Sequence, residues 1–327
     1  MKTVLVTGGA GYVGSHCCKA FAAAGWNVVT LDNLSRGWRD AVKWGPLVEA
    51  DIADRDAVGA AIDRYAPDLV AHFAAYAYVG ESVEQPDLYY SNNTAGTLAL
   101  LETMRAKGVA RILFSSTCAT YGNPVRLPID EDHPQAPINP YGWSKFIIER
   151  MLEDYCQAYG FSSTILRYFN AAGCDPDGEI GERHEPEPHA IPLAIAAALK
   201  EGGVFRVNGT AFDTRDGSAI RDYIHVADLA DAHVLAAEKL LDATGVEIFN
   251  LGTGTGTSVL ELADTVNRAT GGGLQVVHAP PRPGDPAMLV ASAARAQAKL
   301  GWMPSRSSID FIVETALRWQ QSRLQHP

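Results

Sequence analysis

A run of glycines near the amino terminus constrains the fold of this chain more than any other sequence feature. Gly8, Gly11 and Gly14 follow the apolar residues 3–7 and precede a helix-length stretch at residues 15–24. In a strand–turn–helix unit, the first glycine permits the sharp turn, the second lets a pyrophosphate approach the backbone, and the third lets helix and strand pack closely. The motif therefore predicts a dinucleotide site, with the pyrophosphate on the N-terminus of the helix.

One acidic residue narrows the choice of dinucleotide. Asp32 lies eighteen residues beyond Gly14, at the end of a second predicted strand at residues 27–31. A carboxylate at this position accepts hydrogen bonds from both ribose hydroxyls and repels a 2′-phosphate. The alternative is an ordinary turn residue at a strand end. We predict that the cofactor is NAD rather than NADP.

The rest of the first half alternates short β-branched runs with amphipathic stretches, as in a parallel sheet covered on both faces. The predicted strands are residues 3–7, 27–31, 69–73, 111–115 and 162–167, and the predicted helices are residues 15–24, 56–65, 92–107 and 141–159. Beyond about residue 170 the rhythm changes, with prolines clustered at 176–192 and 280–286 and a final helix at 309–322.

These patterns predict an α/β chain with a Rossmann-type doubly wound parallel sheet and a smaller C-terminal α/β substrate-binding domain. We place the NAD-binding domain at residues 1–170 and the second domain at residues 171–327, with the chain crossing back to the first. A second glycine-rich run, Gly252 to Gly256, follows a strand at 248–251 but lacks the Lys-Ser/Thr of a phosphate loop. We interpret it as a tight turn that caps the next helix.

Composition excludes several kinds of partner. The 327 residues carry a net charge of −11, which disfavours nucleic acid and acidic membranes, so an anionic ligand needs local arginines and helix N-termini. No apolar run reaches the roughly eighteen residues that a membrane span needs. Five cysteines form neither an even framework nor a Cys-x-x-Cys pair, so we expect reduced thiols and a cytoplasmic protein.

The segment from His184 to His189 is the one sequence that suggests a metal. It reads His-Glu-Pro-Glu-Pro-His, which lacks the spacing of a helical His-Glu-x-x-His site. Its two prolines would also break the helix which that motif requires. On these grounds we predict no metal.

A tyrosine and a lysine provide the candidate chemistry. Tyr141 and Lys145 stand four residues apart at the start of a predicted helix, so both side chains can point into one cleft. A nearby cation, together with the positive nicotinamide ring, would stabilise the phenolate and let Tyr141 remove a hydroxyl proton. Ser115, Ser116 and Thr117 end a strand at the ligand edge of the sheet, and Thr117 is our candidate for bridging the reacting hydroxyl.

Taken together, these stretches resemble a known family. The sequence is similar to the extended short-chain dehydrogenases/reductases, and within them to the UDP-glucose 4-epimerases. The stretches that carry the resemblance are TGGAGYVGSH, LDNLS, HFAA, VGESV, YYSNN, FSSTCATYG, PYGWSK, LRYFNAAG, DGSAIRDYIHVADLADAH, NLGTGTG and PPRPGD. They cover nearly the whole chain, and RDYIHV and RYFN are far more specific than the glycine motif.

The resemblance implies a mechanism and a set of site residues. A tyrosinate takes the C4 hydroxyl proton, NAD⁺ takes the C4 hydride, and the 4-keto sugar turns before hydride returns to its other face. The implied catalytic residues are Tyr141, Lys145 and Thr117. The implied cofactor positions are Gly8, Gly11, Tyr12, Val13, Gly14, Asp32, Asn33, Asp51, Ile52, Phe73, Ala74, Asn92, Ser115, Tyr141, Lys145 and Phe169. The implied UDP-sugar positions are Thr117, Tyr141, Asn170, His189, Arg221, Tyr223, Arg282, Asp285 and Leu289.

Two positions depart from a well-known version of the family pattern. Ala77 stands where that version has a lysine that reaches the cofactor phosphates, so one cation toward NAD is lost. Leu289 stands where family members carry either tyrosine or a small residue beside the sugar C2 substituent. Leucine is intermediate in size, so UDP-N-acetylhexosamines and the UDP-pentoses xylose and arabinose remain open as substrates beside UDP-glucose and UDP-galactose.

Other functions fit the residues less well. A nucleotide-sugar 4,6-dehydratase needs an acid and a base, usually an Asp-Glu pair directly after the threonine, whereas Cys118 and Ala119 follow Thr117. A noncatalytic NAD sensor on the same fold typically loses the tyrosine or the lysine, and both are present. The resemblance also implies a homodimer that pairs the helices of Asn92 and Tyr141.

Overall fold

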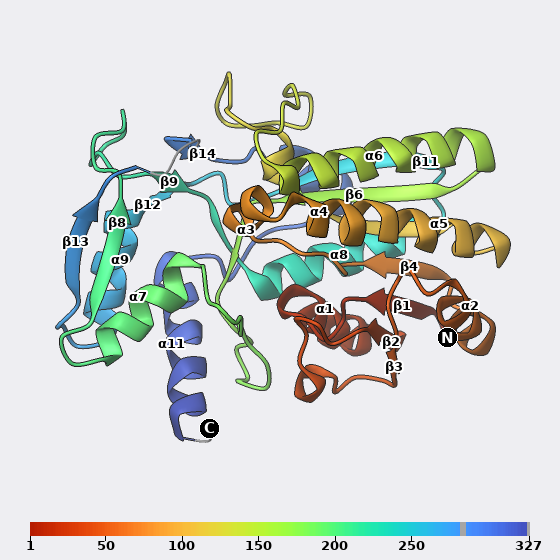
Figure 1. The fold of residues 1–327 in the computed structure, drawn as a ribbon, viewed down its shortest axis with the longest axis horizontal. Coiled ribbons are helices and arrows are strands. Elements are labelled where there is room, and N and C mark those ends of the chain that lie inside the picture. Colours follow the sequence, from red (N-terminus) through yellow and green to blue (C-terminus); the bar gives the residue numbers. More distant parts are fainter. Residues whose placement is uncertain (282–285, 326–327) are drawn as a thin grey trace.

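The computed structural model describes residues 1–281 and 286–325. At its centre lies a seven-stranded parallel sheet in the order β11-β6-β5-β4-β1-β2-β3 (Figure 1). Its strands are β1 (Thr3–Thr7), β2 (Asn27–Asp32), β3 (Leu47–Glu49), β4 (Leu69–His72), β5 (Arg111–Thr117), β6 (Ser162–Tyr168) and β11 (Gly245–Leu251). The strand order reverses direction on the two sides of β1, as in a doubly wound sheet, which confirms the predicted fold class.

The helices of this part cover both faces of the sheet. They are α1 (Tyr12–Ala23), α2 (Arg55–Tyr65), α3 (Val79–Glu84), α4 (Pro86–Tyr89), α5 (Gly96–Ala106), α6 (Pro140–Tyr159) and α8 (Val226–Leu240). Alternate residues of a strand face opposite sides, so Val4 and Val6 pack with α1 and α8, whereas Leu5 packs with α2, α5 and α6. Both faces are apolar because both are buried.

The smaller part of the molecule has its own core (Figure 1). Its helices are α7 (Ala190–Leu199), α9 (Val259–Ala269) and α11 (Ile309–Gln325), and α10 (Ala294–Leu300) packs on α8 and β11. Its strands are β7 (Asn170–Ala172), β8 (Val204–Asn208), β9 (Ile220–Arg221), β10 (Tyr223–His225), β12 (Thr257–Ser258), β13 (Gln275–Ala279) and β14 (Met288–Leu289). Short pairs join β10 to β7, β13 to β8, and β9 to both β12 and β14.

The chain crosses between the two parts. α8 and β11 follow residue 170, yet β11 pairs with β6 at the edge of the large sheet and α8 packs against α1. The division into residues 1–170 and 171–327 stays a prediction, with these segments as its crossing. The crossing brings residues distant in sequence to the same edge of the sheet.

Two elements differ in detail from the sequence pattern. The first residues of the predicted helix 92–107 belong to a π-helical turn, η2 (Tyr90–Ala95), and α5 begins only at Gly96. The Gly252–Gly256 run does form a turn before α9, but Ser258 caps that helix through a capping box with Glu261. The amides of Thr253 and Gly254 in this turn donate instead to the carboxylate of Asp222.

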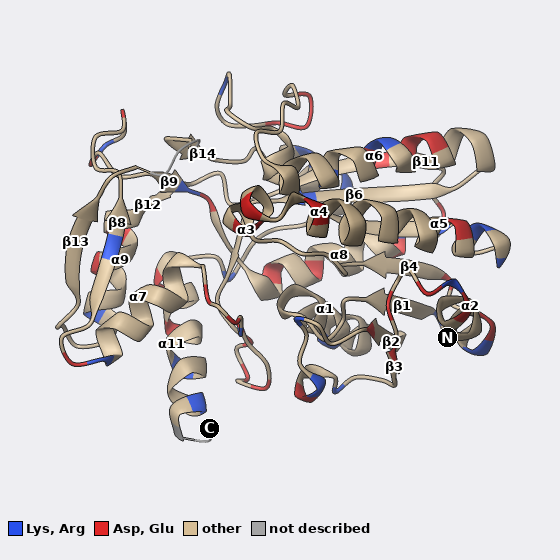
Figure 2. Ribbon diagram, in the orientation of Figure 1, with Lys and Arg blue, Asp and Glu red and all other residues tan. Residues whose placement is uncertain are grey.

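Charge is distributed over the whole molecule. Figure 2 shows acidic and basic residues interspersed on both parts of the ribbon. Among the described residues, no helix is both long and apolar enough to cross a membrane.

Candidate active site

The glycine turn between β1 and α1 is packed as the motif predicts. Gly8 has a φ of +74°, and a Cβ there would lie 2.5 Å from the amide nitrogen of Ala74. A Cβ at Gly14 would lie 2.2 Å from the carbonyl oxygen of Gly8. A Cβ at Gly11 would meet only that same carbonyl, at 3.3 Å, among the described atoms within 4 Å. Gly8 and Gly14 are required by packing, and Gly11 leaves open space over the N-terminus of α1.

Asp32 ends β2 directly beside this turn. Its carboxylate accepts hydrogen bonds from the amides of Ala10 at 2.9 Å and Leu34 at 2.8 Å. Burial raises the pKa of Asp32, and these two amides partly offset the effect. A carboxylate oxygen has a further lone pair, so each oxygen can still accept a ribose hydroxyl. The turn and the carboxylate together fit the pyrophosphate and ribose of a dinucleotide.

Tyr141 and Lys145 lie in the first turns of α6, at the carboxyl edge of β5. The side chain of Asn139 caps this helix by accepting from the amide of Gly142. The Lys145 Nζ donates to the carbonyl oxygen of Ser115 at 2.9 Å and lies 4.9 Å from the centre of the Phe114 ring. Tyr141 and Lys145 are 9% and 3% exposed, so both functional groups are in a dry site.

Burial controls the ionisation of this pair. It raises the pKa of Tyr141 well above its usual value, the nearby Tyr168 adds to the rise, and a hydrogen bond with Thr117 opposes it. Burial also lowers the pKa of Lys145 to about 7, which the negative charge of Glu149 partly offsets. The chain alone therefore holds the phenol protonated, and the expected lowering of its pKa needs a further positive charge.

The three hydroxyls at the end of β5 have different partners. The Thr117 hydroxyl contacts Tyr141 and also accepts from the amide of Ala119 at 3.1 Å. The Ser115 hydroxyl lies 2.6 Å from that of Tyr168 on β6. The Ser116 hydroxyl points the other way and donates to Glu149 at 2.5 Å. Thr117 is thus the hydroxyl placed next to the phenol.

The other predicted cofactor positions lie around the same edge. Tyr12 donates its hydroxyl to the carbonyl oxygen of Gly173, which joins α1 to the smaller part. The Asn33 amide donates to Asp51 at 2.8 Å, and Ile52 packs beneath Gly96. Asn92 lies in the π-helical turn η2, where its side chain donates to that of Asn93. The remaining positions follow strands of the sheet or pack against its core: Val13, Phe73, Ala74 and Phe169.

The predicted substrate positions come from the smaller part. Asn170 and Tyr223 stand opposite each other on the β7–β10 pair. Leu289 on β14 is in register with Arg221 on β9. His189 precedes α7, and its Nδ1 lies 2.8 Å from Glu187. Two further predicted residues, Arg282 and Asp285, lie outside the described residues.

The sequence analysis missed two pairs of supporting residues. Asn93, next to the predicted Asn92, donates to the Ser144 hydroxyl at 3.1 Å and pairs with the backbone of Tyr76. Glu149 is fully buried and forms a bidentate ion pair with Arg167 on β6. Glu149 lies four residues beyond Lys145 and so shares its helical face. That spacing was the signal in the sequence from which Glu149 could have been found.

These features define the class of the protein. A glycine turn at a helix N-terminus, a carboxylate at the end of the second strand and a buried tyrosine–lysine pair lie along one edge of a parallel sheet. This is the arrangement of a Rossmann-fold enzyme that uses NAD and a tyrosine as proton acceptor.

Comparison with known proteins narrows the class to a family. Residues 4–252 match the model of the NAD dependent epimerase/dehydratase family. The chain is 51% identical over 324 residues to the UDP-glucose 4-epimerase of Rhizobium meliloti (strain 1021), which covers 99% of this chain and 98% of that protein. The chain belongs to the NAD dependent epimerase/dehydratase family.

Solved structures agree with this assignment. The UDP-glucose 4-epimerase from Brucella ovis in complex with NAD has a TM-score of 0.94 at 51% identity, over 97% of this chain and 98% of that one. The UDP-glucose 4-epimerase from Stenotrophomonas maltophila with bound NAD and formylated UDP-arabinopyranose has a TM-score of 0.95 at 36% identity, over 100% of both chains.

Proposed function

We propose that this protein is an NAD-dependent enzyme that epimerises UDP-sugars at C4, with UDP-glucose and UDP-galactose as its substrates. The observation that carries the proposal is the meeting of Tyr141, Lys145 and Thr117 beside the glycine turn and Asp32. The relatives named above have the same activity in their names, over essentially the full length of the chain.

The residues of the chain divide the chemistry between them. Tyr141 removes the proton from the C4 hydroxyl, and Thr117 orients that hydroxyl through its own. Lys145 is held by Ser115 at the same edge, where its charge supports the phenolate. Bound NAD supplies a hydride acceptor beside the sugar and returns the hydride. Tyr141 then returns the proton to the 4-keto sugar once the sugar has turned its other face.

Burial of the site explains why Tyr141 stays protonated until the cofactor binds. Burial holds Tyr141 neutral in the chain alone, because the phenolate has lost its water. A positive charge in the same low-dielectric site acts far more strongly on a phenol than it would in water. We therefore infer that the base forms only when oxidised NAD is present.

The UDP group is assigned to the smaller part of the molecule. Arg221 and Tyr223 lie on either side of Asp222 in the sequence. The Asp222 carboxylate accepts hydrogen bonds from amides of the Gly252 turn and from the amide of Ala291. A guanidinium suits a diphosphate well, so we assign Arg221 to the phosphates of UDP. Arg282 and Asp285 complete the proposed set.

The identity of the sugar depends on Leu289. This residue is half-buried against a core cluster with Phe169 and Cys118, and it is in register with Arg221. Its size leaves room for hexoses and pentoses and less for an N-acetyl group. Burial raises the pKa of the Cys118 thiol to about 12, which makes it a poor proton donor, and Ala119 has no donor in its side chain. With no carboxylic acid after Thr117, we infer that the keto intermediate is not dehydrated.

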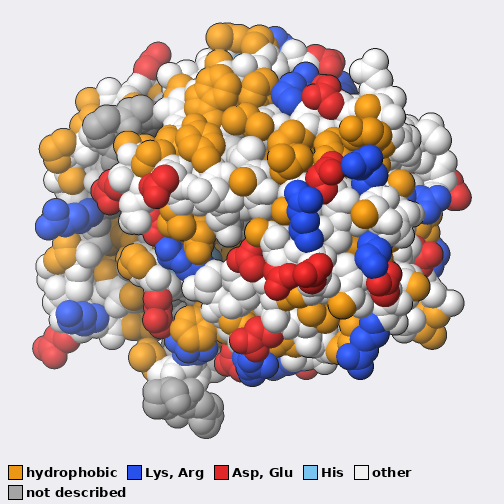
Figure 3. Space-filling view, turned by 45° about the vertical axis from the view of Figure 1, so that its right-hand side comes forward, with side chains coloured by type: hydrophobic (Ala, Val, Ile, Leu, Met, Phe, Trp, Pro, Cys, Tyr) orange, Lys and Arg blue, Asp and Glu red, His pale blue; other side chains and the backbone are white. Residues whose placement is uncertain are grey.

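We also propose a homodimer in a reducing compartment. Large apolar side chains are exposed on α3, α5 and α6, among them Val83, Leu98 and Trp143. Figure 3, in which the side of α5 and α6 is turned forward, shows hydrophobic side chains gathered in the upper part of the molecule. All five cysteines are free thiols, which supports the cytoplasm.

A panel of substrates tests this function. Purified protein with its bound NAD is incubated separately with UDP-glucose, UDP-N-acetylglucosamine and UDP-xylose, and the products are separated by chromatography. We expect UDP-galactose from UDP-glucose, with the slowest conversion for the N-acetyl sugar. Lack of any C4 epimer from all three sugars, in protein that retains NAD, would refute the proposal.

A further inference from the structure

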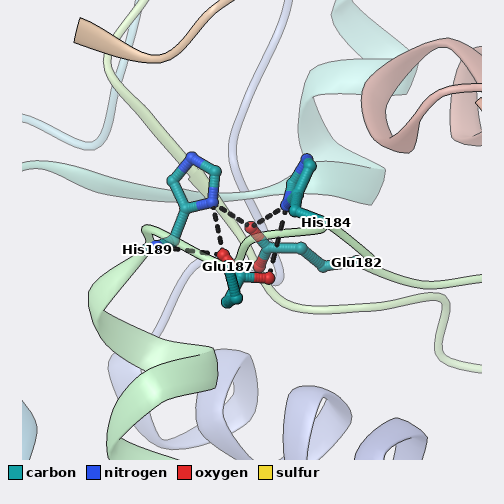
Figure 4. Close-up of side chains that lie close together, drawn as sticks. All are labelled: Glu182, His184, Glu187 and His189. Carbon is teal, nitrogen blue, oxygen red and sulfur yellow. Dashed lines mark hydrogen bonds and ion pairs between the residues drawn. The ribbon is translucent and has the colours of Figure 1, made fainter. Parts of the chain in front are cut away.

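Four side chains on the loop between β7 and α7 converge on one point. Figure 4 shows His184 and His189 directing their rings toward Glu182 and Glu187. One ligand atom from each residue lies within 4.8 Å of all the others. We call these residues the Glu–His quartet. The prolines of the segment prevent a helix, as the sequence predicts. The extended loop nevertheless brings these four side chains together.

Nitrogen and oxygen atoms alternate around the quartet. The His189 Nδ1 lies 2.9 Å from Glu182 Oε1 and 2.8 Å from Glu187 Oε1. The His184 Nδ1 lies 3.4 Å from Glu182 Oε1 and 3.4 Å from Glu187 Oε2. Bonds of about 2.0–2.1 Å to a tetrahedral zinc ion place its ligands roughly 3.3 Å apart. The quartet already has nearly this spacing.

Protons on the two histidines satisfy this arrangement only in part. Each Nδ1 carries at most one hydrogen, yet each faces two carboxylates. His189 directs its hydrogen bond to Glu187, and Glu182 Oε1 is buried without a hydrogen-bond partner although His189 is close to it. The Glu182 side chain is only 4% exposed, so this oxygen has no compensation from solvent. A buried carboxylate oxygen left in this state is costly.

A neighbouring cluster shows how the chain neutralises acids when it uses its own cation. Asp175, Asp177 and Glu179 surround Lys19, whose Nζ lies 2.7–2.8 Å from an oxygen of each. In the quartet, the ion pairs found among the described residues involve only its two histidines. In the metal-free chain the charges of Glu182 and Glu187 raise the pKa of His189 to about 10, against the lowering effect of burial, so a proton provides part of this neutralisation. With both imidazoles deprotonated, the two carboxylates match the charge of a divalent cation.

We propose that the Glu–His quartet binds one divalent transition-metal ion, with zinc as the best fit. Two imidazole nitrogens and two carboxylate oxygens form a borderline donor set, which favours Zn²⁺ over Mg²⁺ or Ca²⁺. The ion would be coordinated through Nδ1 of both histidines, so the substrate contact predicted for His189 would fall to its Nε2 or its backbone.

The contacts around the quartet indicate a structural role. The His184 ring packs on Tyr12 of α1 and on Tyr78 at the start of α3, with ring centres 6.0 and 5.7 Å apart. The Glu182 carbonyl accepts from the indole of Trp319 on α11 at 3.0 Å. A metal here would fix the loop that leads from Asn170 to α7 against the glycine-turn helix, and so tie together the two parts of the molecule.

Metal binding by the full-length protein, without a histidine tag and after treatment with a chelator, tests the proposal. Zn²⁺ alone is titrated without UDP-sugar, and bound zinc is measured by mass spectrometry after desalting. We expect one zinc per chain and a higher melting temperature. Because binding is read without turnover, the result is independent of the proposed activity.

Matched variants locate the ion. Glu187→Gln and His184→Asn each remove one ligand, and we expect zinc affinity to fall at least tenfold, as for loss of ligand support at other sites. Glu185→Gln removes an exposed carboxylate from the same loop and should bind zinc like the parent. Equal zinc binding by all three variants and the parent, or no saturable binding by the parent, would overturn the proposal.

Crystallography of the unsubstituted protein decides the question if a variant fails to fold. Crystals soaked in zinc should show one anomalous peak between the four side chains. A well-ordered quartet with zinc present and no peak between its ligands would also overturn the proposal.

Discussion

At the scale of single residues, the active site is governed by burial more than by the charge of its lysine. Tyr141 and Lys145 share one helical face, as their spacing predicts. However, Lys145 has its own pKa lowered to about 7 by the same burial that raises the pKa of Tyr141. Of the two charges predicted to stabilise the phenolate, the lysine and the nicotinamide ring, we therefore expect the ring to have the larger effect. The protein supplies a dry pocket, and the cofactor must supply the charge.

Replacement of Tyr141 by phenylalanine tests the role of the phenol. We expect turnover to fall by about 10²–10⁴-fold, the usual contribution of a positioned proton acceptor. Bound NAD should remain, because the ring still fills its place against Tyr89. Steady-state rates and the absorbance of released cofactor give the two readouts. An unchanged rate would remove Tyr141 from the mechanism.

At the scale of elements, the turn between β1 and α1 is the best-determined feature of the chain. The sequence predicts its position, its three glycines and the carboxylate beside it, because each follows from steric contact over a few residues. Each was found where the pattern places it, with a Cβ clash of 2.2 Å at Gly14.

The substitution Gly14→Ala tests this turn. The added Cβ would press on the carbonyl of Gly8, so α1 must move away from β1. We expect NAD retention to fall at least tenfold and stability to fall by about 1–3 kcal/mol, as for other overpacked sites. Gly80→Ala is the matched control, because nothing lies within 4 Å of a Cβ there. Equal retention of NAD by the two variants would contradict the packing argument.

The exposed faces of α5 and α6 make the proposed dimer testable. Leu98 and Trp143 are 44% and 42% exposed, which is unfavourable for such large apolar side chains unless a partner covers them. The double change Leu98→Glu and Trp143→Glu should yield monomers in sedimentation experiments. Leu199→Glu changes an exposed leucine on α7 and should leave the dimer intact. A dimer that survives the double change would place the interface elsewhere.

Features that depend on long-range contacts could not be predicted from the sequence. The π-helical turn before α5 has no local signal, and the capping role of Ser258 was hidden behind the more conspicuous Gly252 turn. The Glu–His quartet was interpreted by its spacing alone, and Glu182 was not included. A loop without regular periodicity gives no rule for which side chains converge, because that depends on the helices packed around it.

At the scale of the whole molecule, the site is assembled by a chain that leaves the large sheet and returns to it. The alternation of strands and helices predicts the sheet but not the addition of β11 to its edge. Asn170 follows β6 directly, and the pairing of β10 with β7 brings Tyr223 opposite it. The pairing of distant segments depends on a tertiary core, which local patterns do not encode.

Buried histidines make the stability of the whole molecule sensitive to acid. Burial lowers the pKa of His16, His225 and His233 to about 4 and that of His72 to about 3. Between pH 6.5 and these values the unfolded chain binds protons that the folded chain does not, so stability is lost as the pH falls. Each pKa unit corresponds to about 1.4 kcal/mol per histidine.

Urea unfolding at several pH values checks this expectation. The free energy of unfolding should fall by several kcal/mol between pH 6.5 and pH 4.5, in line with shifts of this size. His233→Phe removes one of the four protons while keeping a ring beside Phe73, so its dependence on pH should be shallower. A free energy that does not change over this range would show that these histidines titrate normally in the folded protein.

The central claim is that hydrogen leaves C4 of the sugar and returns to the same carbon within one closed site. The most direct test uses UDP-glucose deuterated at C4, incubated with the purified protein in ordinary water and followed by mass spectrometry and NMR. The account predicts UDP-galactose that keeps its deuterium at C4. Exchange of that deuterium for solvent hydrogen, at a rate comparable with epimerisation, would contradict it.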